Sequence, residues 1–408
     1  MAEAGAKGAF PLRLVLILGL LSGLAPFCTD LYLPALPAIE EQFNEDLLLF
    51  GFTLSSAMLV NLTLAGSMFG IAWGQILMGY CSDVYGRKPV LFISLVGFVL
   101  FSLLCAWSES ILALVVWRFL QGIFAAGSIV VSRAMGFDMF KGAELLRFMA
   151  TLTLVFGLAP VVSPLFGAFF LEALASHWRE LFFFLAALGV LLFAASFFLH
   201  ETLPKESRTP SGLGHFVAQF LALLRNKTFV CFLLISSFAF AMLFAYISAS
   251  SFVFQNIYAL DKTQYSYIFA LNALGVMAVA SSIARLSNRF ATRSILRVGL
   301  LLCVCGTAGV VSATLFAPSS LVLLELPLFI VIAGFGAVAS TSVAEGLSAI
   351  NSSGGVASGF FGVVNFTFAG LVSPLVGIMG ERNALPMALL MFFCSLFALL
   401  FFLRAGRS

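Results

Sequence analysis

Long apolar runs, separated by short polar segments, follow one another along nearly the whole chain. A helix that crosses a lipid bilayer needs about 20 consecutive apolar residues. The longest runs exceed one straight span, so those helices are expected to tilt, kink or project from the bilayer. The pattern predicts twelve membrane-spanning helices, at residues 12–36, 50–80, 88–107, 110–135, 145–171, 180–200, 228–257, 265–285, 294–316, 319–344, 354–379 and 384–403.

One long polar stretch interrupts these runs. Residues 201–227 combine charged side chains with Pro204 and Pro210, which is typical of a linker. We interpret this stretch as the connection between an N-terminal six-helix half, residues 1–200, and a C-terminal six-helix half, residues 228–408. The predicted fold class is therefore an all-α integral membrane protein whose two halves are pseudo-symmetric.

A short internal repeat supports the division into halves. The segment Val162–Gly167 reads V-S-P-L-F-G, and Val372–Gly377 reads V-S-P-L-V-G. Each copy falls in the fifth predicted helix of its half. Halves related as parallel repeats are a known transporter architecture.

The basic residues fix an orientation. If the N-terminus is inside and the helices alternate, most of the 21 basic residues fall at inner ends and inner loops. The outer loops then carry only Arg179, Lys262 and Arg382, and Arg118 is left within a span. Because Lys and Arg accumulate in cytoplasmic loops, the pattern predicts a multi-pass protein of the cell (inner) membrane with both termini cytoplasmic.

Composition narrows the class of protein. Of the 408 residues, 62% are apolar and 10% charged, whereas a soluble domain has about 25% charged residues. Lipid must therefore be the main solvent of the chain, and a net charge of +3 gives no reason to expect nucleic acid. The 7 cysteines are scattered and predict neither a disulfide framework nor a metal site. No phosphate-binding G-x-x-x-x-G-K-[ST] loop and no catalytic constellation is present in the sequence, so neither a primary pump nor an enzyme is expected.

Charged residues within the spans are the best candidates for chemistry, because each is costly in a bilayer. At a rise of about 1.5 Å per residue, Asp30 lies roughly 10 Å and Arg118 roughly 13 Å below the outer boundary. The similar depth and opposite sign predict that they pair or share a polar cavity, either as a static ion pair or as a proton and substrate site. Glu325, in the tenth span, either joins this cavity or reaches the outer water.

One polar segment stands out between the second and third spans. Gly79–Lys88 has the pattern G-x-x-x-D-x-x-G-R-K, which predicts a tight polar turn with Gly86 at its corner. Asp83 is expected to cap a helix end or to bind basic groups on the inner face, together with Arg87 and Lys88. The pattern resembles the loop between helices 2 and 3 of the major facilitator superfamily of secondary transporters.

Further motifs resemble the Bcr/CflA drug-resistance branch of that superfamily. They are Asp30-x-Tyr32-Leu33-Pro34, Arg118-Phe119-x-Gln121-Gly122, Arg133-Ala134 followed by Asp138, and Glu201-Thr202-Leu203-Pro204. The fifth predicted helix adds a pattern that resembles the antiporter signature, although Ala168 replaces its second glycine. That pattern consists of Gly157, Pro160, Pro164 and Gly167.

The resemblance implies a mechanism and a site. It implies a monomer that exports drugs or other small molecules in exchange for protons by alternating access, with the proton gradient as energy source and no cofactor. It places the cavity among helices 1, 4, 7 and 10, where candidate lining groups are Tyr32, Gln121, Tyr246, Asn272 and Asn365. A proton-coupled exporter or importer of a metabolite, such as an amino acid or sugar, is the alternative, and a non-transporting receptor is a remote one.

Small residues at a spacing of four predict close helix contacts. Gly66, Gly70 and Gly74 have this spacing in the second predicted helix, and Gly355 and Gly359 have it in the eleventh. In the superfamily that contact lies between the halves, so we expect these glycines at the interface that moves.

Overall fold

A computed structural model gives the fold of the chain. It describes residues 12–43, 47–49, 52–172, 177–208, 221–350, 354–378 and 383–405. Twelve helices within these residues are long and apolar enough to cross a membrane, as the sequence predicts. The described residues are otherwise almost entirely helical, so the predicted fold class is confirmed.

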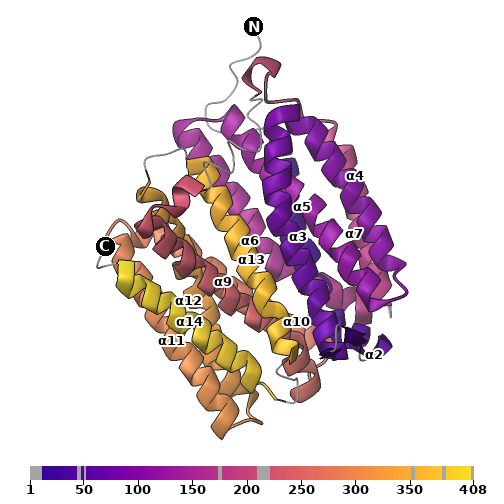
Figure 1. Ribbon diagram of the computed structural model, residues 1–408, viewed down its shortest axis with the longest axis vertical. Helices are drawn as coiled ribbons and strands as arrows, with labels where there is room; N and C mark the ends of the chain where they lie inside the picture. Colours follow the sequence, from indigo (N-terminus) through magenta and orange to yellow (C-terminus); the bar gives the residue numbers. More distant parts are fainter. Residues whose placement is uncertain are drawn as a thin grey trace.

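The helices form two bundles that lie side by side (Figure 1). The first contains α1 (Leu12–Asp30), η1 (Leu33–Ala35), α2 (Leu36–Gln42), β1 (Leu47–Leu49), β2 (Phe52–Leu54), α3 (Ser56–Tyr85), α4 (Arg87–Ala106), α5 (Ile111–Met139), α6 (Gly142–Glu172), α7 (Trp178–Ser196) and η2 (Lys205–Ser207). The second contains α9 (Lys227–Phe252), η3 (Val253–Ile257), α10 (Lys262–Leu286), α11 (Thr292–Phe316), α12 (Leu321–Ser348), α13 (Gly354–Ile378) and α14 (Leu385–Ala405).

The boundaries of the two predicted halves and of the linker stay a prediction. Residues 209–220 of the linker lie outside the described residues. The described part of that stretch contains only one short turn, η2, and a short helical segment at residues 221–224.

Two stretches differ from the sequence prediction. A span was expected to begin at residue 50, but β1 and β2 form a short antiparallel hairpin and α3 begins only at Ser56. The side chain of Ser55 accepts a hydrogen bond from the Met58 amide and so caps α3.

The predicted polar turn at Gly79–Lys88 is shorter than expected. Helix α3 continues to Tyr85 and α4 begins at Arg87, so the turn consists of Gly86 alone. Gly86 has a φ of 104°, which favours glycine because a Cβ atom would be strained there. The expectation for Gly86 is therefore confirmed, whereas the expectation of a turn for Gly79 and Asp83 is wrong.

The glycine stripe of α3 lies within one bundle. A Cβ atom at Gly66, Gly70 or Gly74 would meet the backbone of α5, and Gly122 of α5 returns the contact against α3. The expectation that this stripe lies between the halves is wrong. The contact between the halves is made instead by α3 against α13 and by α6 against α10.

We expect Gly70→Ala to reduce the amount of folded protein sharply. The added methyl group would collide with the backbone carbonyl oxygen of Phe119, which cannot move without shifting α5. Gly359→Ala is the matched control, because a Cβ atom there meets nothing within 4 Å, so the close contact predicted at Gly359 is wrong. Fluorescence size-exclusion chromatography with a melting temperature measures both. Equal melting temperatures for the two variants would contradict the close contact.

The halves are joined at one end of the molecule. The Ser251 hydroxyl donates to the Leu33 carbonyl at 2.6 Å, and the Ser266 hydroxyl donates to the Pro164 carbonyl at 2.9 Å. The Lys262 amide donates to the Glu172 carboxylate at 2.8 Å. These bonds lie where α1 ends and α10 begins, so the structure is closed at that end.

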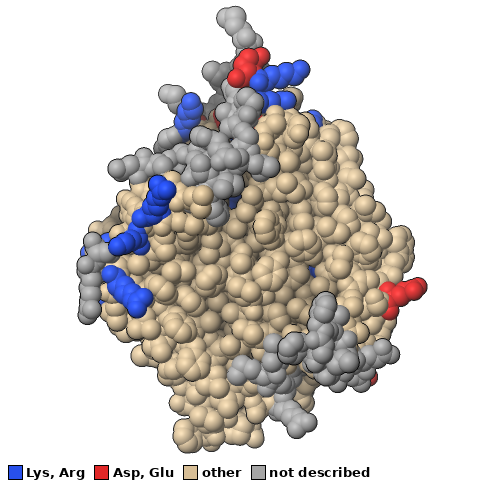
Figure 2. All heavy atoms as spheres, in the orientation of Figure 1, with Lys and Arg blue, Asp and Glu red and all other residues tan. Residues whose placement is uncertain are grey.

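The opposite end is the basic end, which we define as the end where α1 begins, α3 gives way to α4, and α14 finishes. Arg13, Arg87, Arg293 and Arg404 lie in the terminal turns of helices there. In Figure 2 most of the visible blue side chains gather along the upper and left edges, and the broad face between the two ends is almost free of charge. This distribution suits a protein whose middle is surrounded by lipid.

Candidate functional site

A buried arginine lies near the middle of the N-terminal bundle. Arg118 projects from α5 and is 0% exposed. Its Nη1 donates to Gln121 Oε1 at 2.7 Å and to the Cys28 carbonyl at 3.3 Å. The guanidinium carbon lies 4.3 Å from the ring centroid of Tyr32, which adds a cation–π contact.

The neighbours of Arg118 are themselves held in place. Gln121 Nε2 donates to the Ser102 hydroxyl at 2.7 Å, and the Tyr32 hydroxyl pairs with Thr63 at 3.2 Å. Thus α1, α3, α4 and α5 all position this group. Cys28, Ser102 and Thr63 were not singled out in the sequence, because a small polar residue in an apolar run usually only packs.

Two donor groups of Arg118 have no hydrogen-bond partner within the described part of the chain. They are Nε and Nη2, and both are buried. A buried charged group without partners is costly, so these N–H groups are available for a ligand or water. This is the strongest sign of a binding function in the molecule.

Asp30 is the last residue of α1 and is 3% exposed. Its Oδ1 accepts a hydrogen bond from Thr29 at 3.1 Å. Arg118 is near enough to interact with it electrostatically, but no ion pair joins the two among the described residues. Of the two arrangements predicted from the sequence, the structure shows a shared polar site rather than a static ion pair.

The C-terminal bundle contributes a second polar group. Asn272 of α10 donates to the Tyr246 hydroxyl of α9 at 3.1 Å, and both residues are 1% exposed. Glu325 of α12 lies close to Asn272 and interacts electrostatically with Tyr246. Both of its carboxylate oxygens are buried, and within the described residues neither makes a hydrogen bond of normal length, although the Asn272 amide lies nearby. The alternative that Glu325 reaches the outer water is therefore wrong.

The two polar groups face each other across the halves. Asp30 is close enough to Tyr246 and Tyr265 of the C-terminal bundle to interact electrostatically with them. The predicted cavity residues Tyr32, Gln121, Tyr246 and Asn272 are all buried in this structure. The structure thus brings together Asp30, Arg118 and their cavity partners, in a closed arrangement.

Asn365 has a different environment. Its Oδ1 accepts from the Ser237 hydroxyl and its Nδ2 donates to Ser236 Oγ, each at 3.0 Å. These bonds tie α13 to α9. With its amide engaged in this way, Asn365 links two helices in this structure, and its role as a cavity group stays a prediction.

A charged cluster lies at the basic end of the N-terminal bundle, and we call it the basic-end cluster: Asp83, Arg87, Asp138 and Glu201. Arg87 Nη1 lies 2.5 Å from Asp83 Oδ1, and Arg87 Nε lies 2.9 Å from Asp138 Oδ2. Asp83 therefore binds a basic group, one of the two roles that the sequence suggested. The cluster fastens the ends of α3, α4 and α5 together.

Glu201 caps helix α4. Its carboxylate accepts from the backbone amides of Arg87 and Lys88, at 2.9 and 3.1 Å. A negative charge there satisfies amides that lack partners at a helix start and complements the helix dipole. Lys88 Nζ in turn donates to the carbonyl oxygens of Phe197 and Leu199. The segment after α7 is thereby fastened to the turn at Gly86.

The C-terminal bundle has a smaller counterpart. Arg293, at the start of α11, lies 3.0 Å from the carboxylate of Glu345 near the end of α12. The sequence around Arg293 contains no acidic residue in the same loop, and the position of Glu345 at a helix end predicts a solvated charge, which is wrong because its side chain is only 16% exposed. The structure supplies the partner from another helix, as Asp138 does for Arg87.

The residues that resemble an antiporter signature lie along α6. A Cβ atom at Gly167 would meet the backbone carbonyl of Leu31, so α6 approaches the end of α1 closely there. Gly157 has open space around it instead. Pro164 accepts the bond from Ser266 across the halves, and Pro160 lies within the same helix.

Twelve candidate spans in two bundles, with buried charges at the centre, define a multi-pass membrane transporter. The model of the Major Facilitator Superfamily matches residues 18–374. The chain belongs to this superfamily, and it is therefore a transporter and not an enzyme.

Similar proteins agree with this assignment. An uncharacterized MFS-type transporter, YdgK, of Bacillus subtilis is 34% identical, with 93% of this chain and 92% of that protein covered. The bicyclomycin resistance protein homolog of Haemophilus influenzae is 30% identical, covering 95% and 94%. The relatives are consistent with the Bcr/CflA-like branch. A D-xylose-proton symporter structure superimposes with a TM-score of 0.74 at 14% identity, covering 96% and 97%, which shows the shared fold.

Proposed function

We propose that the protein is a proton-coupled exporter of drugs or other lipophilic small molecules that works by alternating access. The observation that carries the proposal is the buried pair Asp30 and Arg118, which lie close together without an ion pair. A carboxylate in this position is costly when charged, so its protonation depends on which side of the membrane it can reach. The name of the Haemophilus relative supports a drug as substrate.

The transport cycle follows from this pair. When the cavity opens outward, Asp30 takes a proton and loses its attraction for a cationic or polar substrate. When the cavity opens inward, the proton leaves and a new substrate binds. One proton moving down a potential of 100 mV supplies about 2.3 kcal/mol, which corresponds to roughly fiftyfold accumulation. The proton gradient is the energy source, and no cofactor takes part.

The orientation belongs to the proposal as well. The basic end faces the cytoplasm of a cell whose inner membrane holds the protein, because Lys and Arg accumulate on that side. Both termini then lie in the cytoplasm, and residues 201–227 form a cytoplasmic linker. The protein works as a monomer, with lipid, protons and a small molecule as its partners.

The basic-end cluster acts as part of the inner gate, together with Gly79, Gly86 and Lys88 around it. We expect Asp138→Asn to lower transport more than Asp83→Ala, because the Asp138 side chain is 16% exposed and that of Asp83 is 56% exposed. An exposed pair contributes only about 0–1 kcal/mol. Transport rates and substrate binding measure the two variants separately.

Gating predicts slower transport with nearly unchanged substrate binding in both variants. Glu206→Gln, in the short turn η2 after the cluster, is the control. Unchanged transport in both cluster variants would contradict the gating role.

One observation favours a second candidate function, the transport of a carboxylate-containing metabolite such as an amino acid. The free Nε and Nη2 of Arg118 match the two oxygens of a carboxylate. A panel of amino acids and lipophilic antibiotics, tested in one vesicle assay, separates the candidates. Gradient-driven accumulation of the antibiotics alone supports drug export, and accumulation of amino acids alone supports the second candidate.

A further inference from the structure

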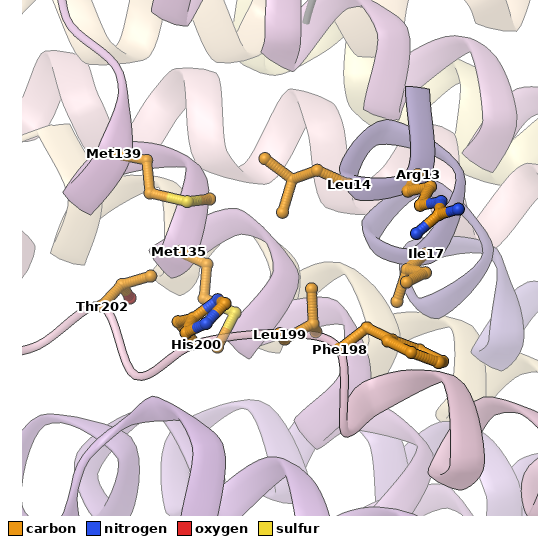
Figure 3. A pocket seen from close by; sticks show the side chains of 9 residues that line it. All are labelled: Arg13, Leu14, Ile17, Met135, Met139, Phe198, Leu199, His200 and Thr202. Carbon is orange, nitrogen blue, oxygen red and sulfur yellow. The ribbon is translucent and has the colours of Figure 1, made fainter. Parts of the chain in front are cut away.

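A pocket of about 360 Å³ lies at the basic end of the N-terminal bundle, away from Asp30 and Arg118. Its walls come from the first turns of α1, the last turns of α5 and the chain just after α7. Figure 3 shows side chains from these three elements around an open space, with Arg13 and His200 on different sides of it. The volume is in the range of about 300–1,000 Å³ that is usual for ligand sites.

The lining combines a positive charge with apolar walls. Arg13 and His200 are its nitrogen-bearing side chains, and Leu14, Ile17, Met135 and Leu199 supply much of the apolar wall. The lining residues include no Asp or Glu. Neither Arg13 nor His200 makes an ion pair with another residue that the structure describes. The pocket therefore suits a ligand with an anionic group and an apolar part, and it disfavours a cation.

The position of the pocket indicates where such a ligand comes from. Arg13 lies in the first turn of a membrane-spanning helix, at the level where lipid headgroups meet the hydrocarbon. The neighbouring apolar side chains of Leu16, Leu20 and Phe198 are 53%, 51% and 72% exposed. These side chains face lipid, so an acyl chain is able to run along them into the pocket.

We propose that this pocket binds an anionic phospholipid from the leaflet at the basic end. The phosphate lies against Arg13, while part of one acyl chain packs on Leu14, Ile17 and Met139. The pocket is too small for a whole lipid, so the rest of the lipid stays in the bilayer. The site is separate from the transport site and does not depend on the substrate.

The lipid would also stabilise the basic-end cluster. Thr202 lines the pocket and donates to Asp138 Oδ2 at 2.8 Å, and Met139 lines it next to Asp138. A ligand that contacts α1, α5 and the chain after α7 holds these elements together. Anionic lipid is therefore expected to favour the conformation in which Asp138 binds Arg87.

Native mass spectrometry of the full-length purified protein tests the site, with phosphatidylglycerol and phosphatidylcholine titrated separately. We expect phosphatidylglycerol to bind more tightly than phosphatidylcholine. Arg13→Gln should weaken phosphatidylglycerol binding about fivefold, because one positive charge near an anionic lipid contributes about 1 kcal/mol to the binding free energy. The matched control is Arg289→Gln, an exposed basic residue of the other bundle, which should change nothing.

A second variant separates the pocket from general surface charge. Met139→Trp keeps the charge but fills the pocket from its rim, where Met139 is 36% exposed. It should weaken phosphatidylglycerol binding with an unchanged melting temperature. Equal binding of the two lipids, an unchanged affinity in Arg13→Gln, or an equal loss in Arg289→Gln would overturn the proposal. Arg13-dependent binding of oleate without binding of phosphatidylglycerol would overturn it in favour of a fatty acid.

Discussion

Replacing Arg118 by lysine is expected to lower the transport rate about thirtyfold. A desolvated cation–π contact contributes about 2 kcal/mol, and its loss corresponds to a factor of that size. Lysine keeps the charge but lacks the planar fork that reaches Gln121 and Cys28 while it lies over Tyr32. Its ammonium group also cannot present two parallel N–H groups to a ligand. The initial rate of substrate uptake into inverted vesicles, at matched protein levels, measures the effect.

Arg297→Lys is the matched control for this prediction. Arg297 also lies over an aromatic ring, at 5.9 Å from the centroid of Phe402, but it is exposed. Its replacement should leave transport nearly unchanged. Equal transport by Arg118→Lys and the parent protein would show that the geometry of Arg118 has no part in the cycle.

Replacing Asp30 by asparagine is expected to remove the gradient-driven accumulation, roughly fiftyfold per proton at 100 mV, while exchange of labelled for unlabelled substrate continues. Asparagine has nearly the same shape and still accepts a bond from Thr29, so the fold should be retained. It cannot take up or release a proton, so the substrate then equilibrates without being driven.

The control for Asp30 is Glu41→Gln, an exposed carboxylate that lies in α2 at the C-terminal end of the first span. This variant should keep the full accumulation. If Asp30→Asn accumulates substrate as the parent does, the proton is carried by another group, and Glu325 is then the next carboxylate to replace.

The sequence was sufficient for the fold because lipid imposes a simple rule on it. A run of about 20 apolar residues must form a helix there, since no water satisfies the backbone. The same rule placed Asp30 and Arg118 at a similar depth, and both are buried in the structure. The depth of a residue in the membrane depends only on its distance along the helix and the rise per residue, so it is predicted without knowledge of how the helices pack.

The face of each helix was much harder to predict. Nearly all positions of a membrane helix are apolar, so the pattern does not show which side contacts which neighbour. The spacing of Gly66, Gly70 and Gly74 therefore predicts a close contact but not the partner helix. The resemblance to the superfamily assigned them to the interface between the halves, although they contact α5. It is also why the ion pair alternative for Asp30 and Arg118 stayed open until the structure showed that the two do not pair.

Contacts between segments that lie far apart in the chain were also not predicted from the sequence. Glu201 caps α4 from more than a hundred residues away, and Glu345 reaches Arg293 from the next helix. Neither contact is predicted by the residues that neighbour the carboxylate in the sequence. A comparison of the two halves offers a signal, because Asp138 and Glu345 occupy similar places, each near the end of a helix beside an arginine that begins another.

The central claim is that substrate movement is coupled to protons, and one measurement tests it most directly. The purified protein is placed in vesicles in the inverted orientation, and a lipophilic antibiotic is supplied outside them. An imposed pH gradient, acid inside, is first maintained and then collapsed with an ionophore. The proposed cycle predicts accumulation against the concentration gradient that dissipates when the pH gradient collapses. Accumulation that ignores both the imposed gradient and its collapse would contradict proton-coupled export.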